Sequence, residues 1–446
     1  MPVSQTASLD RTPLQSLLRF AEYATVFACL VMFTEGLLPR LFASETDPES
    51  TLLRMLWLPV YGLVVIGCLF ELPRLFRISV RLPFLIFILI LACASWAWSI
   101  NPEVTERRAI AIVATTLAGL FLAARYDWRT LLRLLGAVWL FMALVSFISG
   151  VVAPGIAIMD EVHVGAWRGM WWEKNALGGH MARASFVCAF LLVMDRRWRL
   201  VWGGAVTLCA ALVILSTSKT ALLGLLVGLG VLATGAWMRR GVVTTLSTIW
   251  IGFIAVGAMA LVLIVAPGLI FELLGRDATL TGRTDIWTAL LDAIAARPWF
   301  GYGYGAFWGI DSEPAYKVRL ATEWLVPTAH NGWLETALSI GLVGLAGFML
   351  SYLLLLARAI RLAISSWEGI FALGVAAQFL LFSLSESIAL QQNTIVWVVY
   401  VAVAAKVAIS MADLSARAPG HPLQESVIGS GRFGGSGTRA GLVRTR

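Results

Sequence analysis

Long apolar runs recur along the chain, and they constrain the fold more than any other feature of the sequence. Of the 446 residues, 59% are hydrophobic and only 13% are charged. A run of about 17–25 apolar residues can cross a bilayer as an α-helix, because a helix satisfies its backbone hydrogen bonds internally. The sequence therefore predicts an all-α polytopic membrane protein and excludes an ordinary soluble domain.

About twelve membrane-spanning helices are expected, nine before a long polar interval and three after it. The N-terminal segment has no small-residue cleavage site after a short apolar core, so the first span is predicted to be a retained anchor. The expected spans lie near Leu18–Leu38, Met55–Leu72, Leu82–Trp98, Ala109–Ala124, Leu131–Val152, Ala176–Met194, Leu200–Leu215, Ala221–Met238, Val243–Val265, Trp333–Leu356, Gly369–Leu384 and Thr394–Ser410.

Arginine content alternates from loop to loop, which predicts the orientation. By the positive-inside rule, the arginine-rich loops and both termini lie in the cytoplasm. The chain then divides into a cytoplasmic N-terminus (1–17), nine spans (18–265), a large outward loop (266–332), three spans (333–410) and a disordered cytoplasmic tail (411–446). The arginine-rich loops are 74–81, 125–129, 196–199, 239–240 and 358–361.

The opposite loops are expected to face outward, and they contain basic residues against the topological rule. A phosphate-bearing ligand would account for these residues. The net charge of +8 is accordingly attributed to topology and anionic partners, with no nucleic acid expected. The outward segments are 101–108, 154–175, 216–220, 267–335 and 385–393.

The interval from Pro267 to Glu335 gathers Arg, Asp, Glu, His, Trp and Tyr, and it is too long for a simple connection. Apolar spacing in Thr284–Ala296 predicts an amphipathic helix near the membrane surface, which Arg297 and Pro298 end. Glycines then alternate with aromatic residues at 301–305. This pattern follows a helix and not a strand, so we interpret it as a tight turn and not as a dinucleotide-binding motif.

The first two candidate site elements flank short loops on the outer side. Lys174 and Asn175 enter a span that contains His180 and Arg183 on one helical face. Arg183 has a structural alternative, which is snorkelling to the interface or pairing with a carboxylate. Lys219 lies in a polar turn between two spans, where hydroxyls are commonplace but an outward lysine is less expected.

The other two candidate elements lie in the long interval. Arg283 is expected near a helix N-terminus, where its guanidinium and free N–H groups would bind anionic oxygens; Thr281 or Thr284 as a simple helix cap is the alternative. His330 and Asn331 precede an apolar span, and a histidine there can cap the helix or take a proton from a sugar hydroxyl.

Glu335 lies five residues after His330, about 140° round a helix, so a direct pair stays open.

The five cysteines all fall inside apolar runs without the spacing of metal ligands, so we interpret them as small buried hydrophobes. The outward segments show no cluster of acidic residues with the spacing of a magnesium site. No cofactor is therefore expected.

Five short segments, in this order and placement, resemble the O-antigen ligase and polysaccharide polymerase superfamily of bacterial inner membranes, and in particular its exopolysaccharide polymerases. One position departs from the pattern, because Glu173 stands where a histidine is more often expected. The matching segments are 173–178 (EKNALG), 215–220 (LSTSKT), 282–287 (GRTDIW), 297–303 (RPWFGYG) and 330–335 (HNGWLE).

The resemblance implies an inverting, metal-independent glycosyl transfer from a lipid diphosphate to a sugar hydroxyl. It implies that Lys174, Arg183, Lys219 and Arg283 hold the diphosphate and that His330 orients or deprotonates the acceptor hydroxyl. Fixed cations in a partly dry site would stabilise the charge that a leaving diphosphate gains, which agrees with this chemistry.

The expected function is the polymerisation of undecaprenyl-diphosphate-linked repeat units into exopolysaccharide, with the lipid-linked oligosaccharide and membrane lipids as partners, together with other assembly and export proteins. A ligase that moves the glycan to lipid A core or protein stays open. A flippase would carry ionisable residues along the midplane of several helices, and a receptor or anchor would not need His330 or Arg283. Outward aromatic residues would either stack on sugars or anchor the interface: Trp171, Trp172, Trp299, Tyr302, Tyr304 and Trp308.

Overall fold

The computed structural model describes residues 13–42, 51–161, 163–248, 250–252, 254 and 278–417, with the backbone alone described at 278–284. These residues are mostly helical, and their only extended pairing is an isolated bridge between Ile158 and Trp167. The predicted all-α polytopic fold is confirmed. Its α-helices are α1 (Pro13–Phe33), α2 (Leu37–Phe42), α3 (Thr51–Phe70), α4 (Leu72–Ser79), α5 (Pro83–Ala94), α6 (Pro102–Arg125), α7 (Trp128–Val152), α8 (Pro154–Ala157), α9 (Lys174–Met194), α10 (Arg199–Leu215), α11 (Lys219–Met238), α14 (Ala278–Ala296), α15 (Glu313–Thr322), α16 (Gly332–Ser365), α17 (Trp367–Ser383) and α18 (Ile395–Arg417).

Within the described part of the chain, nine helices are long and apolar enough to cross a membrane. A tenth span results if the pair α4 and α5, bent by 99°, counts as one. The shorter α17 has 17 residues, and most of the expected span Val243–Val265 lies outside the described residues. Twelve spans therefore stays a prediction.

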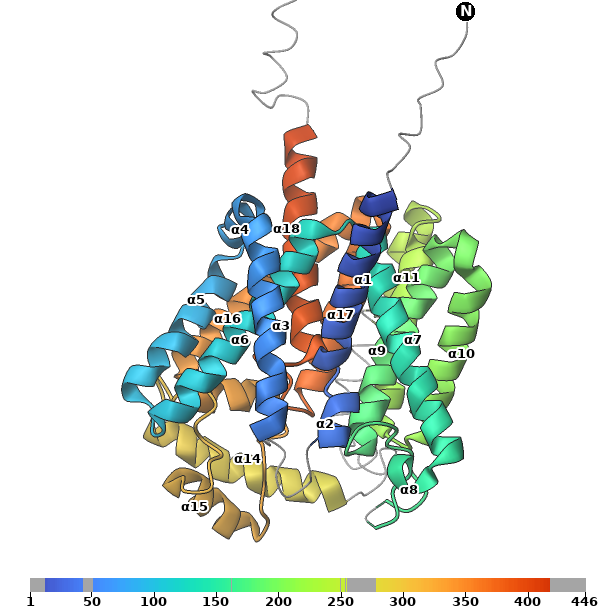
Figure 1. The fold of residues 1–446 in the computed structure, drawn as a ribbon. Coiled ribbons are helices and arrows are strands. Elements are labelled where there is room, and N and C mark those ends of the chain that lie inside the picture. The colour runs from blue at the N-terminus through green and yellow to red at the C-terminus, as the bar shows by residue number, and fades with distance from the viewer. Residues whose placement is uncertain are drawn as a thin grey trace, which may run out of the picture.

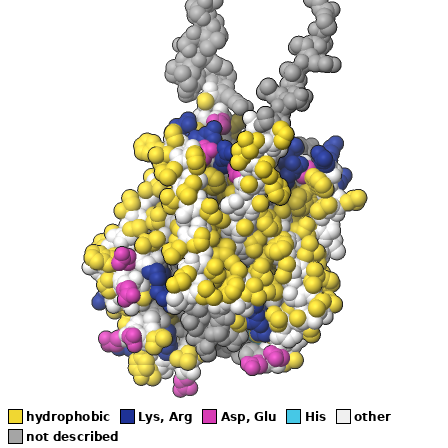
Figure 2. All heavy atoms as spheres, in the orientation of Figure 1, with side chains coloured by type: hydrophobic (Ala, Val, Ile, Leu, Met, Phe, Trp, Pro, Cys, Tyr) yellow, Lys and Arg dark blue, Asp and Glu magenta, His cyan; other side chains and the backbone are white. Residues whose placement is uncertain are grey.

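The helices form a bundle in which the described ends of the chain lie together (Figure 1). The start of α1 and the end of α18 lie at one end, whereas α8, α14 and α15 lie at the other. Figure 2 shows hydrophobic side chains over the middle of the visible face, with Lys and Arg gathered near the end where α1 begins. The polar interval thus lies opposite the described chain ends.

The centre of the bundle is formed by α9 and α18. In each of them, 78% of the residues in the most apolar 18-residue stretch are buried inside the protein. The corresponding share in α1 is 17%, so α1 lies at the periphery. Helix α18 packs against α6, α16 and α17, and α9 packs against α7, α10 and α11. The expected disorder after Met411 is wrong up to Arg417, because α18 continues to that residue; residues 418–446 lie outside the described residues.

The helix expected at Thr284–Ala296 is present, but it begins earlier, at Ala278. Its apolar face, with Ile286, Leu290 and Ile294, is buried in a small separate core with α15 and the start of α16. The helix ends before Arg297, as predicted.

Two predicted spans are broken where the sequence shows continuous apolar character. The first ends at Phe33, and a separate short helix, α2, starts at Leu37. The tenth, α16, has non-helical backbone at Ile340 and Gly341, where φ of Gly341 is 72°. A break of this kind leaves backbone N–H and C=O groups to be paired elsewhere.

The aromatic turn at 298–303 fills the break in α16. Positive φ values of 66°, 101° and 69° at the glycines 301, 303 and 305 confirm the predicted tight turn. A Cβ at Gly301 would lie 2.5 Å from the Leu338 carbonyl oxygen, so only glycine fits there. Four backbone hydrogen bonds join turn and helix: Tyr302 N to Leu338 O (2.8 Å), Gly303 N to Ser339 O (3.1 Å), Leu342 N to Pro298 O (2.7 Å) and Val343 N to Trp299 O (3.2 Å).

Candidate functional site

Two cavities adjoin at the end of the bundle that carries the polar interval. One, of about 630 Å³, lies under the aromatic turn and the start of α16, and the other, of about 670 Å³, lies between α3, α6 and the start of α9. We call them the loop cavity and the outer groove. They share Arg108 and Gln392, so a ligand in one is adjacent to a ligand in the other. Both volumes suit a small-molecule or sugar ligand.

His330 lies just before α16 in a strained backbone conformation, with φ of 46°. Its Nδ1 atom lies 3.8 Å from Oε2 of Glu386, and its ring stacks on Trp324 with centroids 5.7 Å apart. Its Nε2 atom is buried and has no hydrogen-bond partner among the described residues. An imidazole with a carboxylate near one nitrogen and no protein partner described at the other suits a general base.

Glu335 does not pair with His330 but fastens the segment before it. Its carboxylate accepts hydrogen bonds from Trp308 Nε1 (2.9 Å), the Ala329 backbone N–H (2.9 Å) and Ser387 Oγ (3.4 Å). It also lines the loop cavity. The geometry therefore makes Glu335 a positioning residue for His330, and the open question of a direct pair is answered in the negative.

Asn331 is engaged in the fold. Its Oδ1 atom accepts from the backbone N–H groups of Trp333 and Leu334, which caps α16. Its amide nitrogen donates to the Leu384 carbonyl at 3.5 Å. These contacts give Asn331 a structural role at the start of α16. Its role in substrate binding stays a prediction.

Lys174 and Lys219 are the first residues of two helices that meet closely at this end. A Cβ added to Gly178 of α9 would lie 2.6 Å from Cβ of Ala221 on α11, so the two N-termini lie side by side. The Lys174 ammonium donates to Thr217 Oγ1 at 3.4 Å, across the gap between the helices. Two positive helix ends and two lysines form a region suited to anionic oxygens.

Arg183 lies one layer deeper on α9. Its guanidinium stacks on Phe382 at 4.1 Å and lies within electrostatic range of Glu386, the carboxylate that faces His330. His180 stacks instead on Trp171, with ring centroids 4.8 Å apart. The structure therefore brings Arg183 and His330 together around one carboxylate, while His180 belongs to a neighbouring aromatic contact.

Asn175 is half-buried in the first turn of α9. The expectation that Arg283 lies near a helix N-terminus is wrong, because α14 begins at Ala278 and Arg283 lies in its second turn. Backbone N–H groups in a second turn are bonded within the helix, so they are not free for a ligand. For the same reason neither Thr281 nor Thr284 caps this helix. The Arg283 side chain lies outside the described part of the chain.

Glu386 and Arg108 were not singled out from the sequence. Glu386 lies in the loop 385–393, which the sequence predicts to face outward. Arg108 lines both cavities, and its Nη1 donates to the Gly305 carbonyl at 2.7 Å. The available signals were a carboxylate in a short polar loop and an arginine on the outer side against the topological rule.

Glu35 lines the outer groove, and burial raises the pKa of its carboxyl to about 8, partly offset by a hydrogen bond with Thr394. The raised pKa favours the neutral form of this carboxyl, so the other ionisable groups that line the groove are Arg54, Arg107, Arg108 and Glu173. Among the described residues, no group of three or more His, Cys, Asp or Glu side chains is placed to hold a metal ion.

Three of the outward aromatic residues serve the fold. Trp171 is buried and donates to the Thr34 carbonyl at 2.8 Å. Tyr302 and Tyr304 are buried, and their hydroxyls donate to backbone carbonyls. Trp299, which is 65% exposed, keeps a surface for contact with a sugar or the interface.

Comparison with known proteins agrees with this geometry. Residues 204–349 match the family described as O-antigen ligase, and this stretch contains Lys219, Arg283, His330 and Glu335. The chain is also 28% identical over 270 residues to the exopolysaccharide production protein ExoQ of Rhizobium meliloti (strain 1021). That alignment covers 57% of this chain and 60% of the relative, which is less than two thirds of the relative's length.

Proposed function

We propose, from the premise that this multi-pass membrane protein resembles the O-antigen ligase and polysaccharide polymerase superfamily, that it polymerises lipid-linked oligosaccharide repeat units into exopolysaccharide. The observation that carries the proposal is His330, whose Nδ1 faces Glu386 and whose buried Nε2 lacks a partner among the described residues. His330 lies in the matched family region, and Glu386 beside it is within electrostatic range of Arg183. Lys174 begins α9, the helix that carries Arg183, and Lys219 begins the neighbouring α11.

The acceptor hydroxyl would give its proton to His330 Nε2 as its oxygen forms a bond to the anomeric carbon of the donor sugar. Glu386 stabilises the imidazolium that results, because the carboxylate lies 3.8 Å from Nδ1. The bond between the anomeric carbon and the diphosphate oxygen breaks on the opposite face, which inverts the configuration. The lipid diphosphate leaves with the electron pair.

The leaving diphosphate gains negative charge during this step. Lys174, Lys219 and Arg183 would stabilise that charge from one side, and Arg283 would complete the set when its side chain reaches the site. Cations fixed by helices need little reorganisation, so the transfer would proceed without a bound metal. The described residues supply no carboxylate cluster that would recruit one.

We place the chemistry on the periplasmic side of a bacterial inner membrane, with both termini in the cytoplasm. This proposal is supported by the arginine-rich loops and by the position of α14 and α15 opposite the described chain ends. Residues 266–332 would then form the periplasmic loop between the spans at 18–265 and 333–410. Membrane lipids and other assembly and export proteins are the expected partners.

The second candidate is a ligase that transfers the finished glycan to lipid A core or to a protein, which the description of the matched family favours. It would use the same chemistry with a different acceptor. A flippase is disfavoured because the candidate charges Lys174, Lys219, Glu386 and Arg108 gather at one end of the bundle.

The test is polymer output in cells carrying His330→Ala, with the lipid-linked repeat unit assayed by leaflet. His163→Ala, an exposed histidine on the same side, is the matched control. Loss of polymer with single repeats on the outer leaflet supports a polymerase. Persistent polymer that is no longer transferred to its acceptor indicates a ligase. Repeat units trapped on the inner leaflet indicate a flippase. Normal polymer output contradicts the catalytic role of His330.

A further inference from the structure

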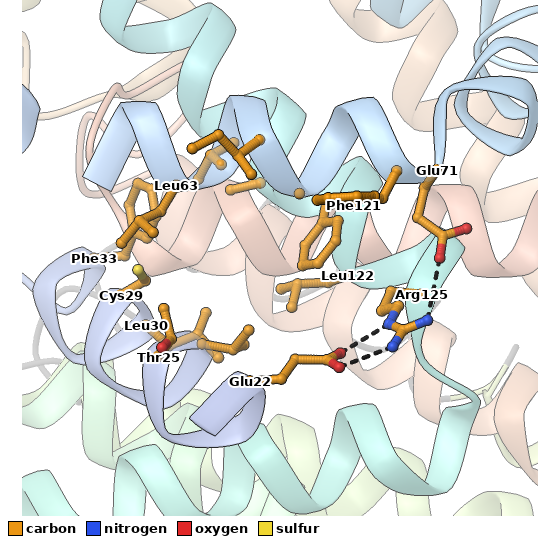
Figure 3. A pocket seen from close by; sticks show the side chains of 16 residues that line it. Glu22, Thr25, Cys29, Leu30, Phe33, Leu63, Glu71, Phe121, Leu122 and Arg125 are labelled. Carbon is orange, nitrogen blue, oxygen red and sulfur yellow. Dashed lines mark hydrogen bonds and ion pairs between the residues drawn. The ribbon is translucent and has the colours of Figure 1, made fainter. Parts of the chain in front are cut away.

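A third cavity, of about 460 Å³, lies between α1, α3 and α6 in the half of the bundle away from the candidate site. We call it the inner crevice. Figure 3 shows its apolar side chains, which include Leu30, Phe33, Leu63 and Phe121. None of its lining residues takes part in the bond-making and bond-breaking steps proposed above.

The inner crevice is closed at one end by Arg125. Its guanidinium forms two hydrogen bonds of 2.8 Å with Glu22 and one of 3.4 Å with Glu71 (Figure 3). Arg74 also donates to Glu71 at 2.8 Å. These basic groups are engaged by carboxylates, so this end offers little to a lipid phosphate.

The crevice opens sideways, toward the region that the bilayer occupies. Helix α3 packs on α6, whereas α1 packs on α7, and the crevice follows the seam between these pairs. Two of its lining residues, Ile66 and Phe70, are 53% and 83% exposed. Hydrocarbon therefore has direct access to it, and an apolar void of this size in a membrane is expected to be filled.

The volume limits how much of a molecule the crevice can enclose. One turn of an α-helix with a diameter of about 10 Å and a pitch of 5.4 Å occupies roughly 420 Å³. The crevice, at about 460 Å³, encloses about that much, so a helix of a second copy of the chain would present only one face to it. A single extended hydrocarbon chain fits.

The outer groove continues the crevice along the same helices. Helix α3 lines the groove up to Tyr61 and the crevice from Leu63 onward. Phe33 of the crevice contacts Trp57 of the groove, with ring centroids 5.1 Å apart and planes tilted by 52°, and Trp57 stacks on Tyr61 with centroids 5.8 Å apart. A chain whose headgroup lies in the groove would reach the crevice by passing these rings along α3.

The combined length of the outer groove and the inner crevice distinguishes a polyprenyl chain from an acyl chain. From Arg54 in the groove to Glu71 in the crevice, α3 and the residue after it rise about 26 Å over 17 residues. That distance approaches the full hydrocarbon thickness of about 30 Å, whereas a phospholipid acyl chain covers one leaflet, about 15 Å. A polyprenyl chain is long enough to occupy both.

We propose that the inner crevice binds the distal part of the polyprenyl chain of a lipid diphosphate whose headgroup lies at the outer end of the same groove. The identity of the headgroup rests on the proposed function, whereas the site itself does not. Binding along α3 would hold the donor at a fixed depth while its sugar reaches His330.

The experiment uses the full-length protein in nanodiscs with a polyprenyl diphosphate that carries a diazirine on its terminal isoprene unit. Mass spectrometry of the cross-linked peptides is expected to find label at 22–33, 63–71 and 118–125. Leu63→Trp should reduce this label by about tenfold, because a bulky ring fills the crevice. Leu69→Trp, on the same helix but exposed and outside the crevice, should leave it unchanged.

A phospholipid that carries the diazirine at the end of its acyl chain tests whether ordinary membrane lipid fills the crevice instead. Equal labelling of the crevice by this phospholipid would overturn the proposal, as would label confined to the groove at 107–111. His330→Ala should keep the crevice label. If His330→Ala loses polymer but the crevice is never labelled, the proposed function stands and polyprenyl binding in the crevice is refuted. If the crevice is labelled but His330→Ala makes normal polymer, polyprenyl binding stands and the proposed function is refuted.

Discussion

Replacing Glu335 with alanine should loosen the segment that carries His330. The carboxylate is the acceptor for the backbone N–H of Ala329 at 2.9 Å and for Trp308 Nε1 at 2.9 Å. Ala329 is fully buried, so its unsatisfied N–H costs about 1–3 kcal/mol. The half-buried indole of Trp308 adds the net value of one hydrogen bond, about 0.5–1.5 kcal/mol.

Together these losses amount to roughly 1.5–4.5 kcal/mol, which lowers the population of the ordered segment relative to its opened form by roughly 10- to 2,000-fold. Hydrogen exchange in nanodiscs, read by mass spectrometry over residues 326–331, measures the opening directly. Polymer synthesis should fall with it. Glu335→Gln should be intermediate, since it keeps one acceptor oxygen but turns an amide N–H₂ toward a donor.

Glu313→Ala is the matched control. Glu313 pairs with Lys317 on the surface of α15, with side chains 78% and 72% exposed, so no measurable change is expected. Wild-type exchange over 326–331 together with full activity in Glu335→Ala would refute the positioning role. Loss of activity with unchanged exchange would mean that Glu335 acts on the substrate itself.

Three further predictions concern the outer end of the bundle. Because burial raises the pKa of Glu35 to about 8 from 4.5, stability should be greatest below about pH 4.5, fall as the pH rises and level off above about 8. Glu35→Gln should flatten this dependence in thermal unfolding of the purified protein, and an unchanged slope would contradict it. Arg283→Lys should impair polymer synthesis nearly as much as Arg283→Ala if two parallel bonds to phosphate are needed, whereas full activity of the lysine variant would show that charge suffices. A chelator should leave transfer by the purified protein unchanged, and strict metal dependence would refute the proposed chemistry.

Local sequence determined most of the helices. Apolar runs specify a span without reference to the rest of the chain, so eleven of the expected spans coincide with helices in the described part. The breaks near Phe33 and at Gly341 were missed, because the latter depends on hydrogen bonds to a turn some forty residues earlier. Such pairings leave no periodic signal in a single sequence.

The candidate site was predicted as separate motifs, and only the fold shows how they meet. His330 and Arg183 were each chosen for their chemistry, but the carboxylate between them, Glu386, comes from a third segment. The start of α14 was set too late: the candidate caps Thr281 and Thr284 lie on either side of Arg283, whereas the helix begins before both, at Ala278. Residue type predicts chemistry, whereas adjacency across segments requires tertiary structure.

The break in α16 also constrains how the protein is made. The turn at 298–303 leaves the ribosome before residues 338–343, so the four backbone hydrogen bonds that fasten it to α16 form last. Its bonds to the earlier chain, from Ile100 N to Tyr302 O (3.0 Å) and from Trp98 Nε1 to Phe300 O (2.9 Å), do not depend on the next span. A chain truncated before Gly332 would therefore keep the turn's contacts with the earlier helices and lack the four bonds that join it to α16.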